Sequence, residues 1–215
     1  MDYVEMIRDG SVGSLPPKEK APDANRDMAR QSGGIITSKE IRRSNIPTVY
    51  LSRMVEDGNL IRVDRGMYMD PSGDYDEYYF FSHRFKVAVF SYVSSLYLQG
   101  LTDIIPNEME FTVYRGYNPH CMNGDVRIHY VTKEIHGLGI TEGTTMFGNN
   151  VKAYDLERTI CDFIKKRNEI ETELFSKIIN NYVRCKNKDM NRLYEYSKQM
   201  KIYRKVKELM EVFYE

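Results

Sequence analysis

The chain has 215 residues, enough for one large or two small domains, and its 41% apolar residues can fill a packed core. Its 31 basic and 31 acidic side chains cancel, which excludes a protein coated with positive charge but not a local basic patch. The three cysteines, Cys121, Cys161 and Cys185, are odd in number and far apart, which favours a reducing compartment over a disulfide framework. The start, MDYVEMIRDG, lacks the pattern of a signal peptide, and no apolar run reaches the ~18 residues of a membrane helix, so we expect a cytoplasmic protein without membrane association.

The first part of the chain contains a predicted linker and the start of a small domain. Residues 1–24 are expected to be an extension or linker, because GSVGSLPPKEKAPDA concentrates Gly, Ser, Pro and charge. A helix is predicted for NRDMARQS, residues 25–32, and a short extended piece for the following GGII. Thr37 or Ser38 is suited to cap the next helix, SKEIRRSN, which carries Glu40 in its first turn.

A second helix and a hairpin complete this domain. Pro47 suits the first position of a helix that runs to about Glu56, and Gly58 suits its termination. The apolar–basic alternation of LIRV predicts a strand, DRG a tight turn, and MYM the return strand. The order helix, strand, helix, turn, helix, hairpin predicts a winged helix-turn-helix over residues 25–72.

The helix that begins near Pro47 has two different faces when its residues are placed ~100° apart. Leu51, Met54 and Val55 fall on the side expected to face the core, and polar residues fall on the other. Arg53 can donate two hydrogen bonds to a guanine. The arginines of the preceding helix suit phosphates, and those of the hairpin suit phosphates or the minor groove. The residues expected to contact double-stranded DNA are Arg42, Arg43, Thr48, Val49, Ser52, Arg53, Arg62 and Arg65.

Two alternatives stay open for this domain. Residues 33–69 hold six basic and four acidic side chains, and a net charge of +2 also suits an ordinary solvated surface. Winged helices also serve as modules that bind only protein.

The remainder, residues 80–215, predicts a larger α+β domain that ends in helices. Residues 70–81 predict a turn-rich boundary, and residues 82–100 a buried helix ended by Gly100. Strands are predicted at EFTVYRG, VRIHYVT and NVKAYD, whereas GLGITEG predicts turns between strands. Four helices are predicted at LERTICDFIKKR, ETELFSKIINNYVRC, DMNRLYEYSKQM and IYRKVKELMEVFYE.

Two charged features of this domain have both a structural and a functional interpretation. Asp155 is suited to cap a helix on which Glu157, Arg158 and Asp162 form either a polar site or, as we favour, ordinary cap and ion-pair contacts. Residues 184–207 carry nine basic and two acidic side chains. This basic C-terminal patch, which includes Lys198, Lys201, Arg204 and Lys205, suits either a solvated surface or an RNA or operator contact.

Three segments resemble one known family. GGIITSKEI with LSRMVEDGNLIRVDRGMY is similar to the N-terminal winged helix of the AbiEi antitoxins, which belong to type IV toxin–antitoxin systems and abortive phage infection. SSLYLQGLTD and AYDLERTICDFI resemble that family's second-domain segments, so the resemblance spans roughly residues 30–185. Ser95 and Gln99 depart from the pattern, which has Ala and His at these places.

The resemblance implies two activities. The winged helix would bind inverted repeats in the promoter of its own operon and repress transcription. The C-terminal domain would act as an antitoxin that counters a nucleotidyltransferase-like toxin without forming a stable complex with it. The resemblance implies no enzymatic activity.

An enzyme is the alternative from the residues themselves. Asp103, Glu108 and Glu110 resemble a Mg²⁺-binding carboxylate cluster of a nuclease, although EFTVYR offers only Arg115 where that motif has a lysine. The four histidines and three cysteines do not have metal-ligand spacing, and no phosphate-binding loop is evident, so we expect no metal and no cofactor.

Overall fold

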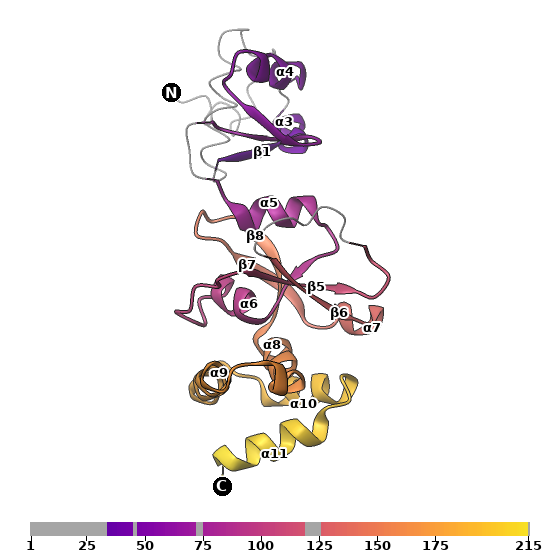
Figure 1. Ribbon diagram of the computed structural model, residues 1–215, viewed down its shortest axis with the longest axis vertical. Helices are drawn as coiled ribbons and strands as arrows, with labels where there is room; N and C mark the ends of the chain where they lie inside the picture. The colour runs from indigo at the N-terminus through magenta and orange to yellow at the C-terminus, as the bar shows by residue number, and fades with distance from the viewer. Residues whose placement is uncertain (1–33, 45–46, 72–74, 119–125, 215) are drawn as a thin grey trace. The chain divides into compact units, whose positions relative to one another are not determined.

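The computed structural model describes residues 34–44, 47–71, 75–118 and 126–214. The chain forms two compact units, the first of residues up to 84 with 145–149, and the second of 85–144 with 150–215 (Figure 1). The predicted linker and the predicted helix at residues 25–32 lie outside the described residues, as does Cys121.

The first unit contains a small antiparallel sheet and three described helices. Its strands pair in the order β1-β3-β2, and a tight turn joins β2 to β3. A cluster of buried apolar side chains forms its core: Ile36, Ile41, Leu51, Met54 and Leu60. The elements are β1 (Ile35–Thr37), α3 (Ser38–Arg43), α4 (Val49–Glu56), β2 (Ile61–Asp64), β3 (Met67–Met69) and α5 (Glu77–Arg84).

Local sequence signals explain the bounds of these elements. Thr37 forms a complete capping box with Glu40: its hydroxyl accepts from the Glu40 amide at 3.2 Å, and the Glu40 carboxylate accepts from the Thr37 amide at 2.7 Å. Gly66 adopts a φ of +73° in the hairpin turn, a conformation that glycine takes without strain. The predicted start of α4 at Pro47 is wrong by two residues, since the helix begins at Val49 after an αR turn at Thr48.

The boundary predicted at residues 70–81 contains the start of a helix. Asp76 accepts a hydrogen bond from the Tyr79 amide at 3.0 Å and thereby caps α5. The sequence did not single out this cap, because Asp76 is one of several acidic residues in DYDEYYFF. Asp76 also accepts from the Thr145 hydroxyl at 2.5 Å and the Asn149 amide at 2.9 Å, so the 145–149 segment is bonded to this unit. The Tyr79 hydroxyl donates to Glu40, which connects α5 to α3.

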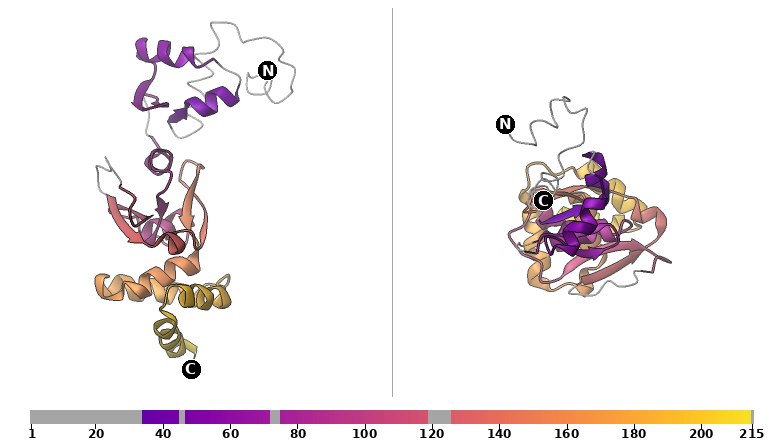
Figure 2. Two further views of the ribbon diagram at one scale, coloured as in Figure 1. Left: turned by 90° about the vertical axis from the view of Figure 1, so that its right-hand side faces the viewer. Right: turned by 90° about the horizontal axis from the view of Figure 1, so that it is seen from above.

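The second unit has a mixed sheet with helices on one side. The described strands pair in the order β6-β5-β4-β8-β7, with β5 parallel to β6 and β4 parallel to β8. Both side views show α8 to α11 on the same side of this sheet (Figures 1 and 2). The elements are β4 (Val89–Phe90), α6 (Tyr92–Leu98), β5 (Met109–Tyr114), β6 (Val126–Val131), α7 (Lys133–His136), β7 (Ile140–Thr144), β8 (Asn150–Tyr154), α8 (Leu156–Lys165), the 3-10 turn η1 (Arg167–Glu169), α9 (Thr172–Arg184), α10 (Met190–Gln199) and α11 (Tyr203–Tyr214).

Two predictions for this unit are wrong. The single helix predicted over residues 82–100 is instead the end of α5, the central strand β4 and the short helix α6, because the apolar run AVF is buried between two other strands. Gly100 does follow the end of α6, with a φ of +66°. In GLGITEG, residues 137–139 form a turn as predicted, but residues 140–143 belong to the edge strand β7, which pairs along the whole length of β8.

The four helices predicted at the C-terminal end are confirmed, and they hold the main core. Their apolar faces pack with α6 into one cluster, which contains Leu96, Ile160, Ile179, Leu193 and Val206. None of the helices in the described part of the chain is long and apolar enough to span a membrane.

Candidate nucleic-acid interface

The helix α4 has one buried and one exposed face. Leu51 and Met54 are almost completely buried, whereas Val49 is 54% exposed and Ser52 and Arg53 are exposed beside it. Thr48 is exposed at the start of the helix and makes no side-chain cap bond, so its hydroxyl is not used by the helix itself. The exposed side of α4 therefore presents polar, basic and methyl groups together.

Arg53 is held loosely over a neighbouring ring. Its guanidinium lies 5.9 Å from the centre of the Tyr50 ring, and within the described residues it forms no ion pair. The acidic residues of this helix, Glu56 and Asp57, are exposed at its other end. Since each residue advances the helix by ~1.5 Å, they lie roughly 10 Å along the axis from Val49.

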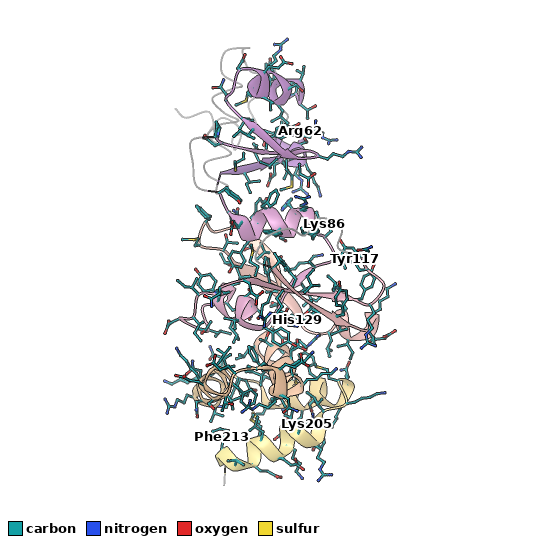
Figure 3. All side chains as sticks on the ribbon, in the orientation of Figure 1. Arg62, Lys86, Tyr117, His129, Lys205 and Phe213 are labelled. Carbon is teal, nitrogen blue, oxygen red and sulfur yellow. The ribbon has the colours of Figure 1, made fainter. Side chains whose placement is uncertain are left out.

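The other predicted arginines of the first unit are exposed on two elements. Arg42 and Arg43 lie on α3, where the Arg42 Nε donates back to the Ser38 carbonyl at 3.2 Å. Arg62 lies on β2 (Figure 3), and Arg65 occupies the turn that follows this strand. Asp64 accepts from the Arg65 amide at 2.6 Å and from Arg84 at 3.2 Å, so its carboxylate is bound within the unit.

The polar residues of α8 are buried and bound. Asp155 caps the helix by accepting from the Arg158 amide at 2.8 Å, as predicted. Glu157 accepts from the Asp189 amide at 2.8 Å, which fixes the start of α10. Burial raises the pKa of Glu157, an effect that this hydrogen bond opposes. Arg158 and Asp162 pair with both side chains buried, so these groups connect elements rather than line an open surface.

The basic C-terminal patch is exposed but partly neutralised. Lys198, Lys201, Arg204 and Lys205 are exposed on α10, α11 and the turn between them, and Figure 3 labels Lys205. Arg204 forms a 2.6 Å pair with Glu208, and Lys207 lies 3.5 Å from Glu211 on the same helix. Lys198 of α10 lies 5.5 Å from the centre of the Tyr203 ring of α11. Its positive charge is therefore weaker than the count of basic residues indicates.

The three carboxylates of the nuclease alternative do not gather. Glu108 pairs with Arg127, Glu110 lies 3.8 Å from His129, and Asp103 is exposed. Within the described ranges, no group of three or more His, Cys, Asp or Glu side chains is arranged to hold a metal ion.

Ser95 and Gln99, the two residues that differ from the family pattern, bind the same backbone carbonyl. The Ser95 hydroxyl and the Gln99 amide donate to the Tyr154 carbonyl at 2.6 and 2.8 Å. SSLYLQGLTD and AYDLERTICDFI, far apart in sequence, are therefore joined by hydrogen bonds between α6 and the end of β8.

The structure also gives Glu110 neighbours that differ from those of the nuclease alternative and that the sequence did not predict. Tyr92, Glu110 and His129 meet in a cleft of the second unit. The one sequence signal for this meeting was the alternation of side chains along the two strands. It places Glu110 and Thr112 on one face of β5, beside Arg127 and His129 on β6.

Comparison with known proteins defines the class of the N-terminal region. Residues 26–69 match the family AbiEi_4, described as transcriptional regulator, AbiEi antitoxin. This confirms the resemblance over that range: the chain carries a transcriptional-regulator domain of the AbiEi antitoxin type, while the two second-domain segments lie outside the match.

A solved structure shares the fold over most of the chain. The RV2827C protein from Mycobacterium tuberculosis is similar with a TM-score of 0.52 and 12% sequence identity, covering 88% of this chain and 74% of that one. No curated protein sequence matches the chain.

Proposed function

We propose that the first unit is a winged helix-turn-helix that binds operator DNA and represses its own operon. The observation that carries this proposal is the exposure of Thr48, Val49, Ser52 and Arg53 on one side of α4, while the other side anchors the core. A recognition helix needs this division, because one face must enter the major groove without unfolding the domain.

The charge distribution supports a definite orientation on DNA. In this orientation Arg53 would lie toward the base edges, with Glu56 and Asp57 about one helical turn further along α4. Arg42 and Arg43 on α3, with Arg62 and Arg65 on the hairpin, are exposed where phosphate contacts would flank the helix. Two copies on an inverted repeat satisfy the symmetry of such a site.

We further propose that the protein is the antitoxin of a type IV toxin–antitoxin operon. The family match over residues 26–69 supports it, and the second unit would counter a nucleotidyltransferase-like toxin without a stable complex. A nucleotidyltransferase-like reading frame beside this gene would agree with the proposal.

A gel-shift experiment on the DNA upstream of the gene tests the repressor proposal. Wild-type protein is expected to bind this DNA more tightly than a random duplex of equal length. Arg53→Ala should weaken binding to the upstream DNA by ~1–3 kcal/mol, the cost of losing a bidentate base contact. Since Arg53 is exposed, this variant should fold normally, which circular dichroism checks.

Lys177→Ala is the matched control, because it removes one exposed positive charge from α9, away from α4 in the sequence. It should bind as wild type does. If the wild-type protein bound both duplexes equally, or if Arg53→Ala bound the upstream DNA as tightly as wild type, the proposal would be wrong.

A further inference from the structure

A cleft of about 880 Å³ opens in the second unit beside the β5–β6 end of the sheet. The two strands and the first residues of α6 form one side, and α8, η1 and the start of α9 form the other. His129, on β6, lies on the side of the sheet that faces α8 (Figure 3). The volume is within the range of small-molecule sites, ~300–1,000 Å³.

The inner wall of the cleft holds unused polar atoms. Glu110 Oε2 and His129 Nε2 are buried, and neither has a hydrogen-bond partner among the described residues. They lie 3.8 Å apart, too far for a hydrogen bond to each other. Because this separation is less than twice a ~2.9 Å hydrogen bond, one ligand atom can reach both. Burying such atoms costs free energy, which a ligand carrying N–H groups would offset.

An aromatic wall adjoins these atoms. The Tyr92 ring stacks on His129 with centroids 4.0 Å apart, and Phe163 meets Tyr92 edge-on at 5.3 Å. Tyr92 is only 6% exposed, so it backs the His129 ring and does not offer an open face of its own. Tyr92 has a φ of +51°, a left-handed conformation that is unfavourable for a bulky side chain. Strain of this kind is concentrated at ligand sites, where the surrounding structure holds a side chain in place.

The edge of the cleft carries exposed charges of both signs, Arg115 and Lys165 beside Glu171. Arg115 and Lys165 are exposed, and within the described part of the chain neither side chain forms an ion pair. Two other basic residues of the lining are neutralised, since Arg127 pairs with Glu108 and Lys166 with Glu169. The cleft thus combines a buried acceptor, an aromatic wall and two exposed cations at its edge.

We propose that this cleft binds a nucleotide, with the base against His129, which is backed by Tyr92, with the N–H groups of the base toward Glu110, and with the phosphate at Arg115 and Lys165. A base supplies both a planar face and N–H donors, and a phosphate suits two unpaired cations. A free amino acid does not match, because its ammonium and carboxylate are bonded to one carbon and cannot divide between a buried wall and an exposed edge. The inference concerns the second unit alone and does not depend on operator binding.

Calorimetry on the full chain tests the proposal with the four nucleoside 5′-monophosphates, their nucleosides, inorganic phosphate and L-tyrosine. Saturable one-to-one binding is expected for nucleotides whose base carries an amino group, with weaker binding of phosphate and L-tyrosine. The ligand could be a free nucleotide or the end of an RNA strand, and a short single-stranded RNA distinguishes these two sources. Tighter binding of the RNA than of its terminal mononucleotide indicates a strand end, and the reverse order indicates a free nucleotide.

Three variants separate the parts of the site. Glu110→Gln keeps the shape of the side chain and should weaken nucleotides and nucleosides alike, by about tenfold, which equals ~1.4 kcal/mol. The double variant Arg115→Ala/Lys165→Ala should weaken the binding of nucleotides about tenfold but leave the binding of nucleosides unchanged. Lys177→Ala, outside the cleft, should change neither.

The proposal is overturned if the wild-type chain binds none of the nucleotides. It is equally overturned if inorganic phosphate binds as tightly as the nucleotides, which would reveal only an anion site. Unchanged binding in both the Glu110 variant and the Arg115 and Lys165 variant would place the nucleotide elsewhere.

Discussion

The guanidinium of Arg158 lies with its Nε 3.2 Å from Asp162 Oδ2, and both side chains are almost completely buried. The same guanidinium donates to the carbonyls of Ile135 and Leu138 at 2.6 and 2.7 Å, and it lies 4.0 Å from the centre of the Tyr154 ring. One side chain of α8 thus fixes the turn after α7, the end of β8 and its own helix.

Removing this arginine should destabilise the second unit strongly. Arg158→Met leaves Asp162 buried without its counter-ion, so we expect the free energy of unfolding to fall by ~3–5 kcal/mol. Asp162→Asn should cost less, about 1–3 kcal/mol, because Arg158 keeps both carbonyl acceptors. Urea unfolding followed by circular dichroism measures both. The reverse order of the two losses would contradict the central role given to Arg158.

The close approach of Gly139 to Arg158 gives a second prediction. Gly139 has a φ of +73°, and a Cβ added there would lie 2.7 Å from the Arg158 Cβ. Gly139→Ala should therefore cost more than the ~1–2 kcal/mol of a left-handed alanine, with ~1–3 kcal/mol added for overpacking.

Gly100→Ala is the matched control for this change. Gly100 has a similar φ of +66°, and an added Cβ would have no neighbour within 4 Å. The difference between the two thermal or urea stabilities measures the clash alone. Equal losses would show that the backbone near Arg158 moves freely.

His136 predicts a pH dependence of stability. Burial lowers its pKa below the usual 6.5, with a further lowering by the charge of Arg158, although the Val87 carbonyl, 2.9 Å from Nε2, opposes the shift. The unfolded chain therefore takes up a proton at a higher pH than the folded one. The stabilisation is complete above pH 6.5 and is lost as the pH falls through the lowered folded pKa.

His136→Gln should reduce this dependence, because the amide can donate to the same carbonyl without titrating. Urea unfolding at a series of pH values between neutral and acidic conditions provides the measurement. A variant whose stability declines as steeply as that of wild type would assign the effect to another group.

If the repressor proposal holds, replacing Arg65 should change the salt dependence of DNA binding. If this exposed turn residue contacts a phosphate, Arg65→Ala should reduce the slope of log K against log salt concentration by ~0.9. The ratio of affinities for upstream and random DNA should stay the same, in contrast to Arg53→Ala. A changed ratio with an unchanged slope would instead assign Arg65 a base contact.

Much of the local structure could be predicted from short-range signals. The capping box of Thr37 and Glu40, the hairpin turn at Gly66 and the cap of α8 at Asp155 depend on residues three or fewer positions apart. The 3.6-residue period likewise separated Leu51 and Met54 from Ser52 and Arg53. These assignments agree with the structure because neighbouring residues alone decide them.

The errors lie where distant pairing decided the outcome. The run AVF forms the strand β4 because β5 and β8 flank it, and the ITEG part of GLGITEG belongs to β7 because β8 pairs with it. A periodic pattern does not report such partners, since the same apolar run suits a buried helix or a buried strand.

The sequence by itself therefore determined the caps, the turns and the two faces of α4, since these depend on backbone geometry within one or two turns of the chain. Only the tertiary structure decided the order of the larger sheet and the meeting of Tyr92, Glu110 and His129 in one cleft. The physical reason is that β-pairing and helix packing join residues far apart in sequence, and the free energy that selects one pairing is shared by the whole core.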